Sequence, residues 1–274
     1  MLRWLRNLGG RTGAGQRRAI PDPLWHDTLQ AYPFLSRHGA GSLGTLRDLT
    51  AGFLAQKEFH GAGGLLITDV IALAIAAQAC LPVLAIAGPR QGLAWYDDFI
   101  GIVVHPCTVV AARESVDEAG VVHAWHEELS GEAMEDGPVT LSWQDVAQAG
   151  RTAGQGYNVV IHEFVHKIDM RDGATDACPP LPAGFMGAAT PVQARRNWLA
   201  TLQAHYLDYC DKLSLAERFG GAPVWLDPYA AASISEFFAV ASEAYFVNPA
   251  AFARDFAALV PMFDAFFGAV TPAG

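Results

Sequence analysis

The chain has 274 residues, of which 51% are hydrophobic and 17% are charged, so it can bury a sizeable core as one large or two small domains. This composition excludes a disordered chain. The formal net charge of −10, with no basic cluster beyond residue 18, argues against a nucleic-acid-binding surface, and we expect no direct contact with nucleic acid.

The N-terminal residues 1–20 are basic, with five arginines, and lack the apolar core of a secretion signal. We interpret them as a flexible arm, with a weak contact to a membrane surface as the less favoured alternative. The four cysteines show no CxxC spacing and no pairing pattern. Together these features favour a cytoplasmic protein.

Residues 24–60 are predicted to be helical, because Leu43, Leu46 and Leu49 recur at near-helical spacing before the glycine-rich break at 61–64. The apolar stretch 63–88 is the one candidate for a membrane span. Polar residues and a proline divide it into runs too short to cross a bilayer, so we expect a buried core helix and no membrane span.

The middle of the chain is predicted to form strands. The segments 100–105, 108–111, 121–125 and 139–143 are rich in β-branched residues, and a glycine- and acid-rich connection precedes the last of them. Further helices are expected after these strands. They are predicted at residues 157–170, 191–213 and 249–268, with a long proline-containing loop at 171–189.

Within the first of these helices, His162-Glu163-Phe164-Val165-His166 places two imidazoles four residues apart. On a helix both rings point the same way and can hold a Zn²⁺ ion, while Glu163 can accept the proton of a metal-activated water. The apolar neighbours predict a buried helix, in which unpartnered histidines would be costly. The alternative is a pair of core histidines bonded to carbonyls, with Glu163 at the surface.

A third metal ligand is expected downstream, because catalytic zinc usually takes three protein ligands and keeps one position open. In the stretch 227–246, Glu236 and Glu243 lie two helical turns apart among apolar residues. A metal ion would partner the first acid, and a ligand histidine would partner the second. An exposed acidic stripe is the alternative.

Three polar side chains are candidates for orienting the metal ligands. Glu243 is one of them. Asp169 lies three residues after His166 on the same helix, and Asn158 lies four residues before His162. The alternative for Asp169 and Asn158 is a purely local contact at the helix ends.

These motifs resemble the Mlc titration factor A (MtfA) family of zinc-dependent peptidases over roughly residues 20–265. The helix that carries EFFA, with a tyrosine seven residues before its glutamate, is also similar to the catalytic domain of anthrax lethal factor. The segments that carry the resemblance are KEFHGAGGLLITDVIALAIAAQACLPVL, IVVHPCTVV, LSGEA, GPVTLSW, HEFVHKIDM and DPYAAASISEFFAVASEAYF.

The resemblance implies one zinc ion per chain, held by His162, His166 and Glu236. It further implies that Glu163 is the general base and that Tyr229 lies near the metal and donates a hydrogen bond to the oxyanion. Manganese or cobalt would also suit mixed nitrogen and oxygen ligands.

The resemblance also implies an α+β fold with a zincin-like (gluzincin) metallopeptidase core. In such a core a mixed sheet lies over the HExxH helix, and here additional helices would precede it. We expect a single peptidase domain over residues 21–270, with an N-terminal helical and sheet part to about residue 150 and a metal-binding helical part at about 151–270.

In zinc peptidases of this type a strand above the active-site helix binds the peptide substrate as an added strand, which requires an open sheet edge. Residues 137–143 are our candidate, because they form the last predicted strand before the metal helix. The alternative is an interior strand without a role in substrate binding.

The sequence therefore predicts a zinc-dependent metallopeptidase acting on peptide or protein substrates, and the resemblance implies aminopeptidase-type cleavage of short peptides. An endopeptidase stays open, since no motif for gripping a free amino terminus is recognisable. The alternative from another class is a regulatory binding protein, because the typical family member is named for sequestering a transcriptional repressor. A degenerate peptidase fold without metal is the third possibility.

Overall fold

The computed structural model describes residues 19–37, 40–116 and 122–269. The arm predicted at residues 1–20 therefore lies almost wholly outside the described residues. Within them the protein mixes a small sheet with many helices, which confirms an α+β fold.

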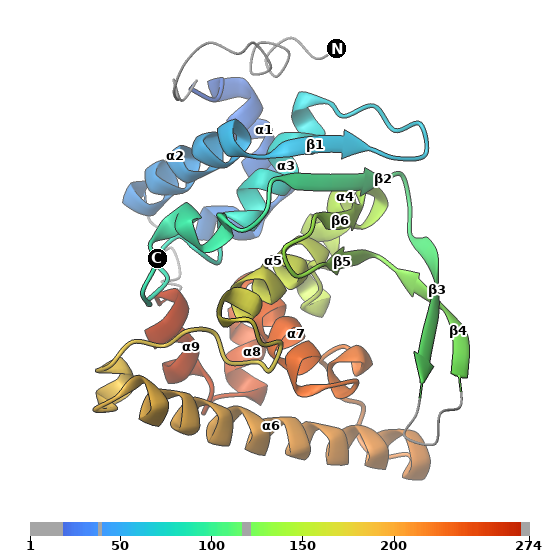
Figure 1. Ribbon diagram of the computed structural model, residues 1–274, viewed down its shortest axis with the longest axis vertical. Coiled ribbons are helices and arrows are strands. Elements are labelled where there is room, and N and C mark those ends of the chain that lie inside the picture. Colours follow the sequence, from blue (N-terminus) through green and yellow to red (C-terminus); the bar gives the residue numbers. More distant parts are fainter. Residues whose placement is uncertain (1–18, 38–39, 117–121, 270–274) are drawn as a thin grey trace.

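A four-stranded mixed sheet, in the order β1-β2-β6-β5, lies in the upper half of the molecule in Figure 1, together with several helices. β1, β2 and β6 are parallel, and β5 runs antiparallel to β6. The register places Ile102 beside Val139 and Glu132 beside Thr140. The strands are β1 (Glu58–Gly61), β2 (Gly101–His105), β5 (Gly131–Ala133) and β6 (Val139–Ser142).

The prediction that residues 137–143 offer an open sheet edge is wrong. β6 pairs with β2 on one side and with β5 on the other, so β5 is the outer strand. A tight turn, in which the Gly137 N–H donates to the Met134 carbonyl at 3.1 Å, folds β5 back onto β6. β5 has only three residues, too few for a sequence pattern to reveal it.

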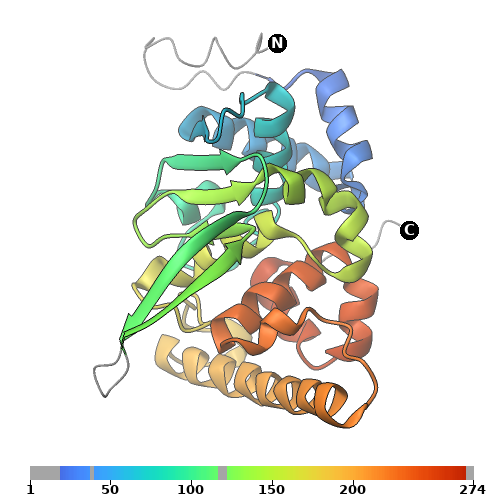
Figure 2. The same ribbon diagram turned by 90° about the vertical axis from the view of Figure 1, so that its right-hand side faces the viewer.

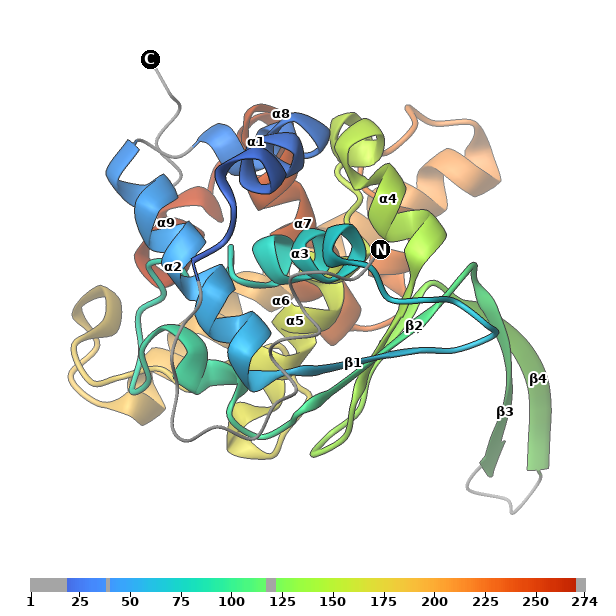
Figure 3. The same cartoon turned by 90° about the horizontal axis from the view of Figure 1, so that it is seen from above.

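The strands β3 (Val109–Val116) and β4 (Val122–Leu129) form a separate antiparallel hairpin between β2 and β5 in the chain. The hairpin projects from the end of the sheet, away from the helical body (Figures 2 and 3). Strands were predicted at 108–111 and 121–125. The structure has a strand at each place, and both strands are longer than predicted.

Helices surround the sheet and fill the lower half of the molecule, where the long α6 runs along the base (Figure 1). The apolar stretch predicted as a core helix is α3, which is buried. No helix in the described part of the chain is both long and apolar enough to cross a membrane. The α-helices are α1 (Asp22–Ala31), α2 (Ala40–Gln56), α3 (Asp69–Ala79), α4 (Trp143–Thr152), α5 (Val159–Asp169), α6 (Pro191–Phe219), α7 (Ile234–Val247), α8 (Pro249–Asp255) and α9 (Val260–Phe267).

Short 3₁₀ turns connect these elements: η2 (Pro33–Arg37), η3 (Gly92–Tyr96), η4 (Ala153–Gln155), η5 (Met170–Asp172), η6 (Phe185–Gly187) and η7 (Pro228–Ala231). The helix predicted over 24–60 is divided, because α1 ends just before Pro33 and residues 58–60 belong to β1. The helix predicted over 249–268 is likewise two helices, α8 and α9. Proline removes a backbone donor and so favours such breaks.

Side-chain caps fix the first residue of every helix from α3 to α8. Each capping oxygen accepts a backbone N–H three residues on, an interaction worth about 1 kcal/mol. The caps of α5 and α7 also fix the positions that the HExxH motif (residues 162–166) and Glu236 take within their helices. The capping residues are Thr68, Ser142, Asn158, Thr190, Ser233 and Asn248.

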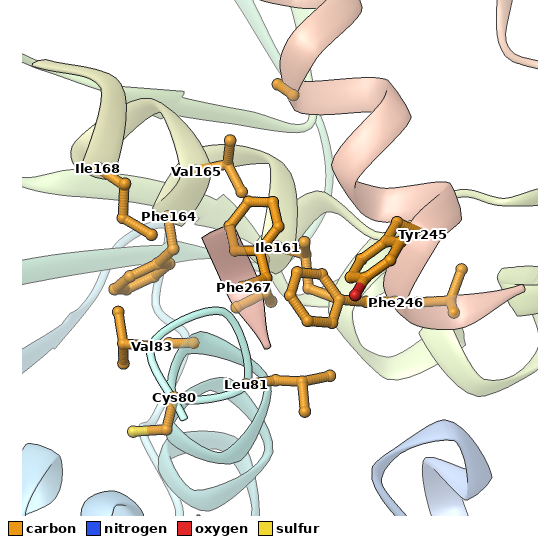
Figure 4. Packing of buried hydrophobic residues seen from close by; sticks show 14 of the residues in the cluster. Cys80, Leu81, Val83, Ile161, Phe164, Val165, Ile168, Tyr245, Phe246 and Phe267 are labelled. Carbon is orange, nitrogen blue, oxygen red and sulfur yellow. The ribbon is translucent and has the colours of Figure 1, made fainter. Parts of the chain in front are cut away.

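Helix α5 is the centre of the fold, because it contacts β5 and β6 on one side and α3 and α7 on others. Its fully buried Phe164 packs against the rings of Phe53, Tyr96 and Phe99 at centroid distances of 5.0–6.0 Å. Apolar side chains from the end of α3, from α5, from α7 and from α9 meet in one core (Figure 4). The HExxH helix is thus held on several sides.

A buried lysine joins α5 to the turn between β5 and β6. The Lys167 side chain is fully buried, and its Nζ donates to the Met134 carbonyl at 2.9 Å. The same Nζ pairs with Asp98 Oδ2 at 2.8 Å and lies 4.7 Å from the centre of the Phe99 ring. Asp98 also pairs with Arg171. This network holds the outer strand against the helix.

We predict that Lys167→Met lowers the free energy of unfolding by about 3 kcal/mol, because it leaves the Met134 carbonyl without its donor and leaves the Asp98 carboxylate with Arg171 as its one remaining cationic partner among the described residues. Urea denaturation in excess chelator measures this without a contribution from bound metal. The control is Lys212→Met, which breaks an exposed pair with Asp208 and should cost less than about 1 kcal/mol. Equal losses in the two variants would contradict a structural role for the buried pair.

Candidate metal centre and active site

Three side chains from two helices converge on one point beneath the sheet. Glu236 Oε2, from the first turn of α7, lies 3.0 Å from His162 Nε2 and 3.2 Å from His166 Nε2 on α5. The two Nε2 atoms are themselves 3.2 Å apart. Among the described residues, His162, His166 and Glu236 form a group of side chains that could hold a metal ion, and we call it the metal group.

The geometry of this group suits a tetrahedral zinc ion. Ligand atoms placed 2.0–2.2 Å from zinc at tetrahedral angles lie about 3.3–3.6 Å from one another, slightly wider than the 3.0–3.2 Å found here. Two imidazole nitrogens and one carboxylate oxygen form a ligand set common in catalytic zinc sites, with a fourth position left for water or substrate. His162, His166 and Glu236 therefore fit a zinc ion.

Glu243 contacts the ring nitrogen of His162 that does not face the metal position. Its Oε1 lies 2.8 Å from His162 Nδ1, and its Oε2 accepts the backbone N–H of Asn158. The Asn158 side chain caps α5 by accepting the Ile161 N–H at 2.9 Å and donates to Gln78 on α3. With Nδ1–H donating to Glu243, the Nε2 lone pair of His162 points to the metal position.

A serine holds the second histidine. Ser235 Oγ lies 3.4 Å from His166 Nδ1 and donates to Asp169 Oδ2 at 3.2 Å. Asp169 Oδ2 also accepts the Ala177 N–H at 2.9 Å. Asp169 therefore reaches His166 through Ser235, in contrast to the direct contact expected from the sequence.

The charges of the metal group are strongly coupled. Burial alone would lower the pKa of His162, but hydrogen bonds to Glu236 and Glu243 raise it well above its usual value. Burial opposes ionisation of Glu236, yet the two imidazoles hold the pKa of this carboxyl well below its usual range. Glu236 is thus ionised, as a ligand of a metal cation must be. Metal binding would displace the proton that the raised pKa of His162 favours on its ring.

Glu163 lies on the side of α5 that faces the outer strand. It is 5% exposed, and the Ala133 N–H donates to its carboxylate. A side chain at Gly131 would place its Cβ 2.4 Å from Glu163 Oε1, so only glycine leaves room there. Burial raises the pKa of Glu163 to about 7, and an adjacent cation would lower it again.

Tyr229 lies across from the first histidine, on η7. The Asp227 carboxylate caps η7 by accepting the Tyr229 N–H at 2.9 Å. The Tyr229 ring centre is 6.1 Å from that of His162, and the residue is 46% exposed. A cavity of about 170 Å³ opens between these groups. Its lining residues are Ser130, Gly131, Tyr157, Val159, His162, Glu163, Asp227, Tyr229, Val240 and Glu243.

The sequence analysis missed three residues of this site: Ser235, Gly131 and Asp227. Adjacent helical residues point about 100° apart, so the position of Ser235 beside Glu236 carried no spacing signal. Gly131 lies within a segment noted only for its resemblance to a family, and Asp227 begins a stretch noted for that resemblance and for its two glutamates.

Comparison with known proteins identifies the family of the chain. Residues 5–268 match the family described as glucose-regulated metallo-peptidase M90. The chain belongs to this family. Mlc titration factor A of Salmonella arizonae is 33% identical over 246 residues, which cover 90% of each chain. Mlc titration factor A of Klebsiella pneumoniae subsp. pneumoniae is 32% identical over 243 residues, which cover 89% of this chain and 84% of the relative. The resemblance to the Mlc titration factor A family is therefore confirmed, and membership of a metallo-peptidase family implies a metal ion.

We predict that Ser235→Ala weakens zinc binding about tenfold, because it removes the hydroxyl that links His166 to Asp169. Competition with a chelating dye measures the affinity directly and needs no turnover. Ser242→Ala is the matched control, since Ser242 is a buried serine of α7 whose hydroxyl donates to the Phe238 carbonyl within the same helix. Unchanged zinc affinity in Ser235→Ala would show that the hydroxyl does not orient His166.

Proposed function

We propose that the protein is a zinc-dependent metallopeptidase of the HExxH…E, or gluzincin, type. The convergence of His162, His166 and Glu236 within 3.0–3.2 Å carries this proposal. Family membership supports a metal-dependent peptidase. The ligand set favours zinc, and buried partners behind both histidines support a metal site over a pair of structural histidines.

A bound zinc ion would polarise the scissile carbonyl and lower the pKa of a water molecule to about 7. Glu163 accepts the proton of the attacking water and later returns it to the leaving amine. The Glu163 carboxylate lies against Gly131, where a side chain would collide with it, and it accepts the Ala133 N–H. Tyr229, on the open side of the cavity, donates a hydrogen bond to the developing oxyanion.

The outer strand β5 is the proposed binding edge for the peptide backbone. It is the strand nearest to Glu163, and β6 covers only one of its sides. A peptide added alongside β5 would bring a backbone carbonyl over the metal group. We propose aminopeptidase-type cleavage of short peptides, supported by the family resemblance and by a cavity of about 170 Å³ that suits a single small substrate group. Cleavage of amino-terminally blocked peptides would instead indicate an endopeptidase.

We predict that Glu163→Gln lowers the turnover of amino-acyl chromogenic substrates at least about 100-fold, because the amide cannot accept the proton of water. Its zinc content should equal that of the wild type, since Glu163 is not a ligand. Glu135→Gln in the exposed β5–β6 turn is the control and should keep full activity. Full activity in Glu163→Gln would rule out this residue as the base.

A second function, binding of an Mlc-type transcriptional repressor, is proposed because the relatives are named Mlc titration factor A. The Glu163→Gln variant separates the two functions. If it binds the purified repressor as tightly as the wild type while hydrolysing nothing, the binding does not depend on catalysis. If neither protein binds the repressor, the second function is wrong.

A further inference from the structure

The cavity beside the metal group has the size of one substrate group. At about 170 Å³ it is close to an engineered cavity of about 150 Å³ that holds one benzene molecule. Its boundaries include His162 and Glu163, so a group bound in it belongs to a residue that flanks the scissile bond. Val159 and Val240, both buried, give it an apolar wall.

Three carboxylates line this cavity, and His162 is the basic side chain among its lining residues. Two of the three carboxylates already have an assigned role. Glu163 is the proposed base, and Glu243 is bound to His162 Nδ1 and to a backbone N–H. Asp227 is the third. No lysine or arginine of the described chain pairs with it.

Asp227 lies at the partly exposed mouth of the cavity, where η7 begins. One of its oxygens, Oδ1, caps η7 at the Tyr229 N–H. Asp227 is itself a lining residue of the cavity, as is Tyr157. Burial is the main cause that raises the pKa of Tyr157, and the charge of Asp227 makes a smaller contribution in the same direction. The carboxylate can therefore act on a group bound in the cavity as well as on its own turn.

We propose that Asp227 selects substrates that place an ammonium group in this cavity, either a free amino terminus or the end of a lysine side chain. An ammonium group gains Coulomb attraction here that a neutral group does not, and the attraction is strengthened where water is excluded. The apolar wall of Val159 and Val240 suits the aliphatic carbons next to such a group. The inference rests on the proposed peptidase function.

Asp227→Asn tests the charge without removing the cap. The asparagine Oδ1 can still accept the Tyr229 N–H, and the side chain keeps its size. Zinc content and far-ultraviolet circular dichroism should match the wild type. Asp208→Asn, on the exposed surface of α6, is the matched control that loses one negative charge away from the cavity.

Two substrate pairs identify the source of the ammonium group. The first pair is an amino-acyl chromogenic substrate and its N-acetylated form. The second is a pair of blocked, internally quenched peptides that carry lysine or methionine next to the scissile bond. The wild type should prefer the ammonium-bearing member of one pair at least tenfold in kcat/KM. In Asp227→Asn this preference should fall at least fivefold, mainly through the KM of the ammonium-bearing substrate, whereas Asp208→Asn should keep the preference of the wild type.

The pair that loses its preference names the bound group: the first indicates a free amino terminus and the second a lysine side chain. A wild type that hydrolyses peptides without either preference, or an Asp227→Asn variant that keeps the preference, overturns the inference and leaves the peptidase function standing. A zinc-loaded wild type that hydrolyses no peptide in the panel overturns the proposed function itself.

Discussion

One buried carboxylate joins the two helices that build the metal group. Glu243 on α7 is 1% exposed, and both of its oxygens are occupied, one by His162 Nδ1 at 2.8 Å and one by the N–H of Asn158. A charge buried so deeply is tolerated only when such partners satisfy it. Because Asn158 also caps α5, Glu243 sets both the start of the HExxH helix and the rotation of its first ring.

The rest of the site follows from how α5 and α7 are held. The cap at Ser233 starts α7 so that Glu236 lies in its first turn, opposite the two histidines. Lys167 holds the turn that follows β5, and β5 contacts Glu163 through the Ala133 N–H and leaves room for it at Gly131. The proposed ligands, the proposed base and the outer strand are therefore positioned by contacts of helices and strands rather than by loops. Only Tyr229 and its neighbours on η7 come from an irregular segment.

Helical geometry explains which parts of the site were predictable. The four-residue spacing of His162 and His166, and the seven-residue spacing of Glu236 and Glu243, bring side chains to one face of a helix whatever the tertiary context. Contacts between elements carry no such period. The three-residue β5 and the role of Ser235 depend on tertiary packing, so the outer strand was misassigned and the serine was missed. Likewise, the division of the first and last predicted helices depends on prolines and on strand pairing beyond the reach of periodicity.

Elemental analysis of the purified protein tests the three-ligand site most directly. The wild type should contain about one zinc ion per chain, and Glu236→Ala should lose it while keeping its fold, because two histidines alone hold zinc far more weakly. Full zinc occupancy in Glu236→Ala would contradict the assignment of Glu236. A wild type that is folded yet takes up no zinc, even when zinc is added, would contradict the metal centre as a whole.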